Sequence, residues 1–345
     1  MPGTFLGFPY DEELFNDTWG AAPDPVKDAM VKSGALVDDA TIAGMVQGKG
    51  NLYSIPFYNI LTGDPDNYDG QTDINTAETS GDSQTGVVFG RAKGFTARNF
   101  TAELTGADPM GNIANSVATY WQKRRQNILL QYLAGIFGVT GASGYAKSWG
   151  SNHIVDLSSS TATPYKIGVT DLNDLATQAL GDNKSQFSLV VMHSNVAKTL
   201  ENLEVLEYWK QTDANGVQRP LALGSVNGYT VIVDDGVPAV VTGGTGDNKA
   251  LIKYTTYLLG NGCLRTAKAR VDVPSETFRD PKTNGGQDTL YTRIRETIHP
   301  NGFSFVPPTS GFSGSPTDVQ LAASANWSVK FDPKAIAMAE IITNG

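Results

Sequence analysis

The sequence predicts an α+β fold organised around one long helix. Three observations lead to this prediction. A helical stretch with its own start and stop signals occupies residues 109–137. Runs rich in β-branched and aromatic residues lie on both sides of it, and short helices alternate with strands only within residues 166–260. Helices packed on a short sheet make residues 166–260 a compact α/β or α+β domain, and with the strand runs outside it the whole chain is predicted to be α+β.

Residues 1–50 predict an extended arm. They hold two short helical patterns, and the first of these, residues 26–32, is too short to be stable without a partner surface. The N-terminus has no basic region followed by an apolar run, so we expect no signal peptide. The apolar runs of the chain are also well below the roughly 18–20 residues that cross a bilayer, so we expect no membrane partner.

Residues 51–101 predict a long β-hairpin. Strand patterns at residues 51–61 and 86–101 flank residues 62–85, which hold six acidic residues and no Lys or Arg. A segment of this composition cannot form a core of its own, and a loop of this length is uncommon inside a compact domain. We therefore expect the hairpin to project from the body of the protein.

Residues 109–137 predict a helix of about 28 residues, which at 1.5 Å per residue is a rod of roughly 40 Å. Globular helices average only about 11–12 residues. Asp108 suits the N-cap, Pro109 the first helical position and Gly138 the C-terminal stop. The rod contains no candidate catalytic residue, so a structural role is favoured.

After the rod, the sequence predicts a connector, a compact unit and a return to strands. Residues 139–165 are rich in Gly, Ser and Thr, which favours a connector with a short strand at 153–157. The elements expected within 166–260 are, in order, a helix capped by Thr170, a strand at 187–192, a helix capped by Ser194 that extends to residue 209, and strands at 228–234 and 251–259. The elements expected within 261–345 are a long strand at 289–298 with one solvated face and a last strand at 336–342.

Candidate catalytic and metal-binding side chains are few and scattered. His153, His193 and His299 share no motif, and the sequence has no G-x-S-x-G elbow. Cys263 is the only cysteine, which excludes an intrachain disulfide or a cysteine-based metal site and favours a small core residue. We therefore expect no catalytic, cofactor-binding or metal-binding residue. A hydrolase that uses His193 or His299 stays open as an alternative function, and His→Ala variants would test it.

The acidic residues permit two further inferences. Residues 64–70, DPDNYDG, invite a calcium interpretation, but an EF-type loop needs Glu at its twelfth position, where this chain has Asn75. A flexible acidic loop tip is therefore favoured. The net charge of −9 argues against a general nucleic-acid-binding surface. It is compatible with a wall that encloses DNA without gripping it and, equally, with plain solubility.

The order of these elements (arm, projecting hairpin, rod, compact unit, return strands) resembles the major capsid proteins of tailed bacteriophages, which share the Hong Kong 97-type fold. Local sequence is similar to one siphophage subfamily along nearly the whole chain. The similar segments are GADP at 106–109, ATYW at 118–121, LAGIF at 133–137, VMHS at 191–194, GYTVIVDD at 228–235, FRDP at 278–281, IHPNGF at 298–303 and ANW at 325–327.

The resemblance implies a division of the chain and a role for it. The implied parts are an N-terminal arm (1–50), an extended β-hairpin loop (51–101), a peripheral domain (102–165) containing the spine helix 109–137, an axial domain (166–260), and peripheral return strands with the C-terminal segment (261–345). The implied role is that of a shell subunit, with no enzyme activity and no cofactor. An encapsulating nanocompartment shell of the same fold is the alternative.

The resemblance also implies partners and a location. Copies of the chain would assemble as hexamers and pentamers around double-stranded DNA, which they would enclose without sequence-specific binding. A portal, a separate scaffolding protein and a decoration protein are the further partners expected. The virion capsid, assembled in the cytoplasm of a bacterial host, is the expected location.

A contact between neighbouring subunits follows as a hypothesis. The acidic loop of one subunit and the basic middle of a neighbour's rod carry opposite charges, which would set register more than affinity. The candidate residues are Asp64, Asp66 and Asp69 in the loop and Lys123, Arg124 and Arg125 in the rod. A solvated helix face is the simpler interpretation of the basic residues. If the contact exists, charge reversal at Arg124 and Arg125 should impair assembly while leaving the monomer folded.

Overall fold

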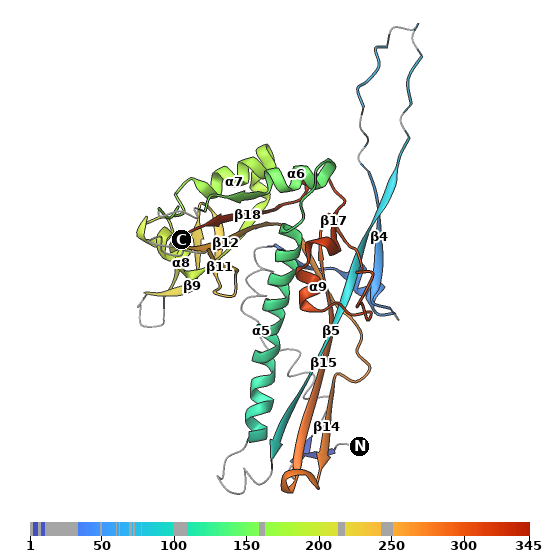
Figure 1. Cartoon of the computed structure of the whole chain (residues 1–345), viewed down its shortest axis with the longest axis vertical. Coiled ribbons are helices and arrows are strands. Elements are labelled where there is room, and N and C mark those ends of the chain that lie inside the picture. The colour runs from blue at the N-terminus through green and yellow to red at the C-terminus, as the bar shows by residue number, and fades with distance from the viewer. Residues whose placement is uncertain are drawn as a thin grey trace.

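The computed structural model describes residues 3–5, 8–10, 34–48, 50–59, 61, 63–68, 71, 73–76, 78–98, 109–158, 163–212, 218–242 and 251–345. Figure 1 shows these parts arranged around the long helix α5 (Pro109–Phe137). A compact body lies beside one end of the helix, a long twisted sheet runs along its other side, and a thin projection extends beyond that sheet.

Helix α5, the rod, has the predicted bounds. Its first half packs on the long sheet through Trp121, whose indole nitrogen donates to the Thr292 hydroxyl at 3.0 Å. Its second half is mostly buried; the buried residues there are Ile128, Leu129, Leu130, Tyr132, Leu133, Ile136 and Phe137. The expected N-cap, Asp108, lies outside the described residues. Gly138 follows the last helical residue, as predicted.

The long sheet has the strand order β3-β13-β15-β5-β4, and β14 pairs with β15 next to β13. Its strands are β3 (Leu36–Asp38), β4 (Leu52–Tyr58), β5 (Gly81–Arg98), β13 (Leu264–Lys268), β14 (Ser275–Asp280) and β15 (Gln287–Pro300). The predicted hairpin is confirmed, because β4 and β5 pair antiparallel from Leu52 opposite Val87 to Tyr58 opposite Gly81. The second strand was predicted to begin at residue 86, but β5 begins at Gly81, because its pairing with β4 continues into the acidic segment.

Strand β15 differs from the expected strand at 289–298 in two respects. It extends to Pro300 and so includes His299, because β13 pairs there with Arg265 opposite His299. The solvated face predicted for this strand is only partly solvated. Tyr291 is exposed, whereas Arg293 and the following outward residues are partly or fully covered by neighbouring strands and loops.

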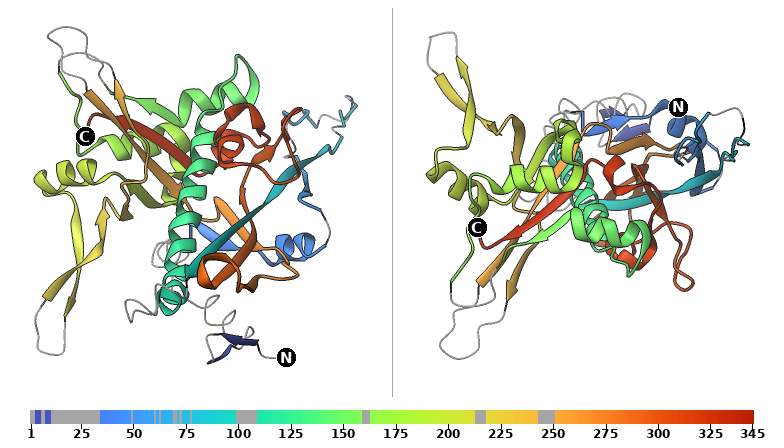
Figure 2. Two further views of the ribbon diagram at one scale, coloured as in Figure 1. Left: turned by 60° about the horizontal axis from the view of Figure 1, so that its bottom comes forward. Right: turned by 90° about the horizontal axis from the view of Figure 1, so that it is seen from above.

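The compact body is built on a second sheet, in the order β6-β18-β12-β7-β10-β9-β8, with β11 paired to β12. Its strands are β6 (Ile154–Asp156), β7 (Phe187–Met192), β8 (Glu207–Thr212), β9 (Gln218–Val226), β10 (Tyr229–Val233), β11 (Ala239–Thr242), β12 (Leu251–Gly260) and β18 (Met338–Thr343). Figure 2 shows the β8–β9 hairpin, in yellow, extending outward from this body. β18 comes from the C-terminal segment, and the division into domains stays a prediction.

The alternation along β7 explains how this sheet is covered on both faces. Val190 and Met192 pack with helices α7 (Asp171–Leu180) and α8 (Ser194–Asn202). Leu189 and Val191 belong to the cluster that includes the rod. A strand buried on both faces is expected to read as a continuous apolar run, as Phe187–Met192 does.

Two expectations for the helices were wrong. The connector at 139–165 contains helix α6 (Gly144–Asn152), which its Gly- and Ser-rich sequence does not predict. Burial of Trp149 stabilises it, because the indole stacks on Phe137 with ring centroids 5.3 Å apart. Helix α8 ends at Asn202 rather than residue 209, since Glu204 has a left-handed φ of 57° and the chain then enters β8.

The capping residues also differ from expectation. Thr170 precedes α7, but its side chain makes no capping hydrogen bond. Helix α8 is capped by His193 rather than Ser194: the His193 Nδ1 accepts from the Asn195 N–H at 3.1 Å. A neutral imidazole can do this with its unprotonated nitrogen, as a carboxylate would.

The remaining elements lie at the N-terminus and along the return path. They are β1 (Gly3–Phe5), β2 (Phe8–Tyr10), α3 (Ala40–Val46), β16 (Phe303–Phe305), α9 (Asp318–Ala322), β17 (Trp327–Val329) and the 3-10 turns at Gly181–Gln186, Thr283–Gly285, Ser324–Asn326 and Pro333–Ala335. The helix expected at 26–32 lies outside the described residues. Residues 307–326, here called the strap, cross the rod and carry α9.

The strap approaches the rod most closely at Gly135. A Cβ placed on Gly135 would lie 2.2 Å from the Leu321 carbonyl oxygen, and the Trp327 indole donates to that same oxygen at 2.8 Å. Only glycine leaves room for this contact, because the obstructing atom belongs to the backbone.

Gly135→Ala is therefore expected to destabilise the unassembled chain by about 2–3 kcal/mol, through overpacking against the strap. Urea unfolding of the monomer measures this. Gly44→Ala is the matched control, since Gly44 is an exposed helical position in α3 with open space around it. It should raise stability by about 0.5–1 kcal/mol. Equal effects of the two substitutions would contradict the packing argument.

Glu340 is a buried acid in the sheet of the compact body. It lies on β18, opposite Ile154 of β6 and Tyr257 of β12, and is 8% exposed. Burial raises its pKa from 4.5 to about 8, and the nearby Asp156 carboxylate adds to the rise. The folded chain therefore holds this proton between about pH 4.5 and 8, whereas the unfolded chain releases it, so stability falls as pH rises through this range.

Glu340→Gln removes this proton linkage. The unmodified chain should lose about 2–4 kcal/mol of its free energy of unfolding through this linkage as the pH rises from 5 to 8. The variant should not show this loss. Unfolding titrations at the two pH values measure the change, and Glu78→Gln, an exposed acid in the projection, serves as the control. A pH dependence identical to that of the unmodified chain would refute the assignment.

Candidate functional site

The histidines and the cysteine serve packing and capping. His153 is fully buried and stacks on Trp149, and its Nδ1 lies 2.7 Å from the Met338 carbonyl. His299 is 1% exposed, with its Nε2 3.0 Å from Gln84 Oε1. Burial lowers the pKa of each imidazole to about 4, so both are neutral at pH 7. Burial also raises the pKa of the Cys263 thiol to about 12, which leaves it unreactive.

His193 lies beside two polar residues, Asn195 and Asp235. Its ring lies against Tyr254, and its Nδ1 is 3.6 Å from the Asp235 carboxylate and 3.1 Å from the Asn195 amide. The Ser194 hydroxyl lies 3.4 Å from the same nitrogen, so Nδ1 makes all three of these polar contacts at the start of α8. Within the described residues, no group of three or more His, Cys, Asp or Glu side chains is arranged to hold a metal ion, and no helix has the length and apolarity to cross a membrane.

The basic cluster of the rod is largely engaged within its own chain. Arg124 forms an ion pair with Asp318 of the strap, which also pairs with Arg91 of β5 at 2.7 Å. Arg125 is bidentate to Glu296 of β15, with its Nε 2.8 Å from Oε2. The acidic partners of both guanidinium groups therefore belong to the same chain, Asp318 and Glu296, and not to the acidic loop. Lys123, in contrast, is exposed.

Asp318 was not identified from the sequence, although a local signal surrounds it. Thr317 and Gln320 form a capping box at the start of α9, with Thr317 N–H donating to Gln320 Oε1 at 2.9 Å. This T-x-x-Q pattern is visible in the sequence and places Asp318 in the first turn of the helix. Its arginine partners come from segments about 200 residues away, so no local pattern could name them.

Gln126 links the rod to the compact body. Its amide donates to Asp234, in the turn after β10, and Gly236 of the same turn lies close to the Leu130 side chain of the rod. The sequence predicts the strand at 228–234 but not the position of the turn that follows it against the rod. Consecutive residues Arg124, Arg125 and Gln126 thus hold the strap, the long sheet and the compact body.

The acidic candidates lie on the projection, defined here as residues 59–80 beyond the β4–β5 pair. Asp64 and Asp66 are exposed, and Asp66 accepts from the Asn75 N–H at 2.6 Å and from its amide at 3.0 Å. These hydrogen bonds lower the pKa of Asp66 below its usual range. Asp69 lies outside the described residues. Figure 1 shows the projection directed away from the rod, so the acids do not meet the basic cluster within one chain.

The projection and the end of β4 also expose large apolar side chains. Exposure reaches 82% for Tyr58 at the end of β4, and 68% for Leu61, 90% for Tyr68 and 70% for Ile74 in the projection. Contiguous exposed apolar residues on an extended segment mark a surface that another molecule covers. These exposed apolar side chains are therefore the candidate assembly surface of the chain.

Comparison with known proteins agrees with this geometry. No protein-family model matches the chain. The major capsid protein of Bacillus phage SPP1 is 28% identical over 316 residues, which cover 90% of each chain. Among solved structures, the capsid of Ralstonia phage GP4 superposes with a TM-score of 0.53 at 14% identity, over 87% of this chain and 85% of that one.

Two further capsids share the fold. The capsid structure of Helicobacter pylori bacteriophage KHP30 gives a TM-score of 0.52 at 12% identity, over 94% of this chain and 92% of that one. The cyanophage Pam1 capsid gives 0.52 at 11% identity, over 88% of both. The chain therefore has the Hong Kong 97-type capsid fold and is similar along nearly its whole length to a phage major capsid protein.

Proposed function

We propose that this chain, as the major capsid protein of a phage head, assembles into hexamers and pentamers of an icosahedral shell around double-stranded DNA. The observation that carries the proposal is the relationship to the SPP1 major capsid protein over 90% of both chains. The chain is a component of the virion capsid and assembles with copies of itself. A portal, a separate scaffolding protein and a decoration protein are the proposed further partners.

The exposed projection and the net charge of the subunit support this proposal. The projection buries almost nothing within its own chain, and its described residues are exposed. Elements of this kind gain stability only when a neighbour covers them. The net charge of −9 supports enclosure of DNA without tight binding, because neutralising phosphates requires clustered cations.

Electron microscopy of the expressed chain tests the assembly. The unmodified chain, expressed alone and with candidate scaffolding protein, should form closed shells or capsomer rings. Shells isolated from infected cells should contain double-stranded DNA. Shells that contain a protein cargo would support the nanocompartment alternative, and a stable small monomer under all conditions would refute both.

The acid–base contact between subunits is tested best at Lys123. Lys123→Glu is expected to reduce shell formation several-fold, because it places a negative charge before the neighbour's acidic loop, while monomer stability stays within about 0.5 kcal/mol. Normal shell yield from Lys123→Glu would remove the proposed contact.

Arg125→Glu is the informative comparison. It would set two carboxylates together at the buried Glu296, so it should destabilise the monomer by about 3 kcal/mol or more. The intrachain ion pairs of Arg124 and Arg125 predict that charge reversal at either residue also destabilises the monomer, so these variants do not isolate the contact between subunits. A double measurement of unfolding and assembly separates the two effects. An Arg125→Glu monomer as stable as the unmodified one would contradict the intrachain pairing.

A further inference from the structure

The β4–β5 hairpin is attached to the rest of the chain in two ways. From Arg98 to Val88, β5 forms a backbone ladder with β15, which ends where Val88 lies opposite Thr297. Beyond this point, residues 81–87 of β5 pair with β4, and these two paired strands are here called the hairpin base. Figure 1 shows that the hairpin base carries the projection. Side-chain hydrogen bonds hold the base on its β15 side.

Gln84 and Ser304 make these hydrogen bonds. The Thr85 N–H donates to the Ser304 hydroxyl of β16 at 3.0 Å. Gln84 is buried, and its Oε1 lies 2.9 Å from the Gly302 nitrogen and 3.0 Å from Nε2 of His299. His299 lies near the end of β15 and is also buried. A buried contact between two side chains therefore joins β5 of the hairpin base to the end of β15.

The two contacts of Gln84 fix which nitrogen of His299 carries the proton. A backbone N–H can only donate, so the Gln84 atom that faces Gly302 is the carbonyl oxygen, an acceptor. The same oxygen faces the imidazole, so Nε2 donates and Nδ1 holds the lone pair of the neutral ring. Nδ1 is buried and, within the described residues, has no hydrogen-bond partner. A second proton on this ring would therefore have no acceptor.

The charged and titratable groups described around His299 do not compensate a positive imidazole. Arg265 lies opposite it on β13, and Asp39 at the start of α3 is 3.4 Å from the Arg265 guanidinium. The Tyr53 ring of β4 lies 6.0 Å away between ring centroids. Burial, and then the charge of Arg265, lower the pKa of His299 to about 4, and Asp39 opposes this shift only in part. Protonation therefore disfavours the closed arrangement of these residues.

We propose that His299 is a pH-sensitive switch at the hairpin base: its neutral ring holds the base closed through Gln84, and mild acid opens this contact. In the open arrangement the imidazole reaches water and takes its second proton there. The ladder from Val88 to Arg98 does not involve these side chains, so the base can separate from residues 299–304 while the long sheet stays paired. The inference goes beyond the proposed shell function, because it concerns the unassembled chain.

The size of the effect follows from two pKa values of the same ring. The pKa of His299 is about 4 in the closed base and close to 6.5 where water reaches the imidazole. Between these values each pH unit of acidification favours the open base about tenfold, so the closed base is most stable above about pH 6.5 and loses stability as the pH falls toward 4. From pH 7 to pH 5 the ratio of open to closed base should rise about twentyfold.

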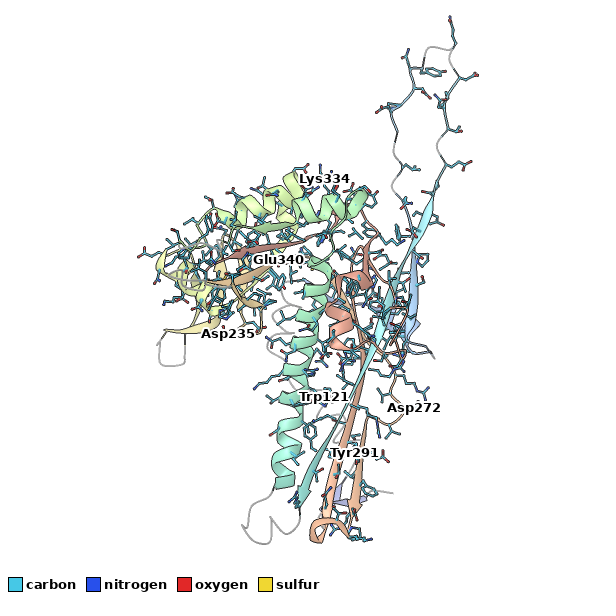
Figure 3. All side chains as sticks on the ribbon, in the orientation of Figure 1. Trp121, Asp235, Asp272, Tyr291, Lys334 and Glu340 are labelled. Carbon is cyan, nitrogen blue, oxygen red and sulfur yellow. The ribbon has the colours of Figure 1, made fainter. Side chains whose placement is uncertain are left out.

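Hydrogen exchange tests the switch in the unassembled chain. Protection of the Thr85 and Gly302 amides, corrected for the pH dependence of intrinsic exchange, should fall about twentyfold from pH 7 to pH 5. The ladder between β5 and Tyr291, in the lower part of the long sheet in Figure 3, is the internal reference and should stay protected at pH 5 while the base exchanges. Unchanged protection of the base, or exchange of the base and the ladder together, would overturn the proposal.

Replacing the imidazole separates His299 from other groups that titrate in acid. His299→Gln keeps a donor toward Gln84 and cannot gain a proton, so protection of the base should be nearly independent of pH between 7 and 5. His153→Gln is the matched control, because His153 is a second buried imidazole with a pKa of about 4, and here the base should still lose protection. A full pH response in the His299→Gln chain would overturn the assignment.

NMR of the ring nitrogens gives a second readout, which decides the proposal if His299→Gln fails to fold. At pH 7 the unmodified chain should show the His299 tautomer with its proton on Nε2, and the ring should still be neutral at pH 5. The His153→Gln and His193→Gln chains serve to assign the signals. A proton on Nδ1 at pH 7, or an imidazolium already formed at pH 6, would overturn the proposal.

Discussion

The structure depends on the burial of one end of a single helix. Between Ile128 and Phe137 the rod is enclosed by the inner face of the compact body's sheet, the upper part of the long sheet and the strap. One continuous apolar cluster contains side chains from all of these parts. Hydrophobic burial is non-directional, so it brings these layers together without fixing their angles. The close approach of the Leu321 carbonyl to Gly135 supplies part of the missing geometry, because a backbone contact tolerates almost no displacement.

Polar contacts along the middle of the rod also fix the angles between the layers. Arg124, Arg125 and Gln126 are consecutive, so their side chains leave the helix about 100° apart. Each binds a different neighbour: the strap, β15 and the turn after β10. The partners of a partly buried charge must be well oriented to offset its desolvation, which favours one arrangement of the layers over others. The basic residues Arg124 and Arg125, which suggest a partner-binding patch in the sequence, thus mainly orient parts of their own subunit.

The sequence predicted those elements whose signals are local. The rod, the β4–β5 hairpin and strands β7, β10 and β12 follow from periods of 3.6 and 2 residues, whereas β8, β9 and β11 were not predicted. Helix α6 was missed because Trp149, packed on Phe137, stabilises a sequence with weak helical propensity. The end of α8 was misplaced because strand pairing with β9 overrides the helical pattern after Asn202. The candidate site was predictable in its residue types and not in its pairings. The partners of Arg124 and Arg125 come from sequence positions 194 and 171 residues away, and only the tertiary fold determines them.

The position of β18 has a consequence for synthesis. This strand lies between β6 and β12 and pairs with both, yet it follows every other strand of that sheet in the chain. During translation the sheet of the compact body therefore has a gap between β6 and β12 until residues 338–343 have left the ribosome. A product truncated before Met338 lacks the apolar strand that joins these two neighbours, so it cannot complete the body. The topology thus makes completion of the body, and with it incorporation of the subunit, depend on synthesis of the last strand.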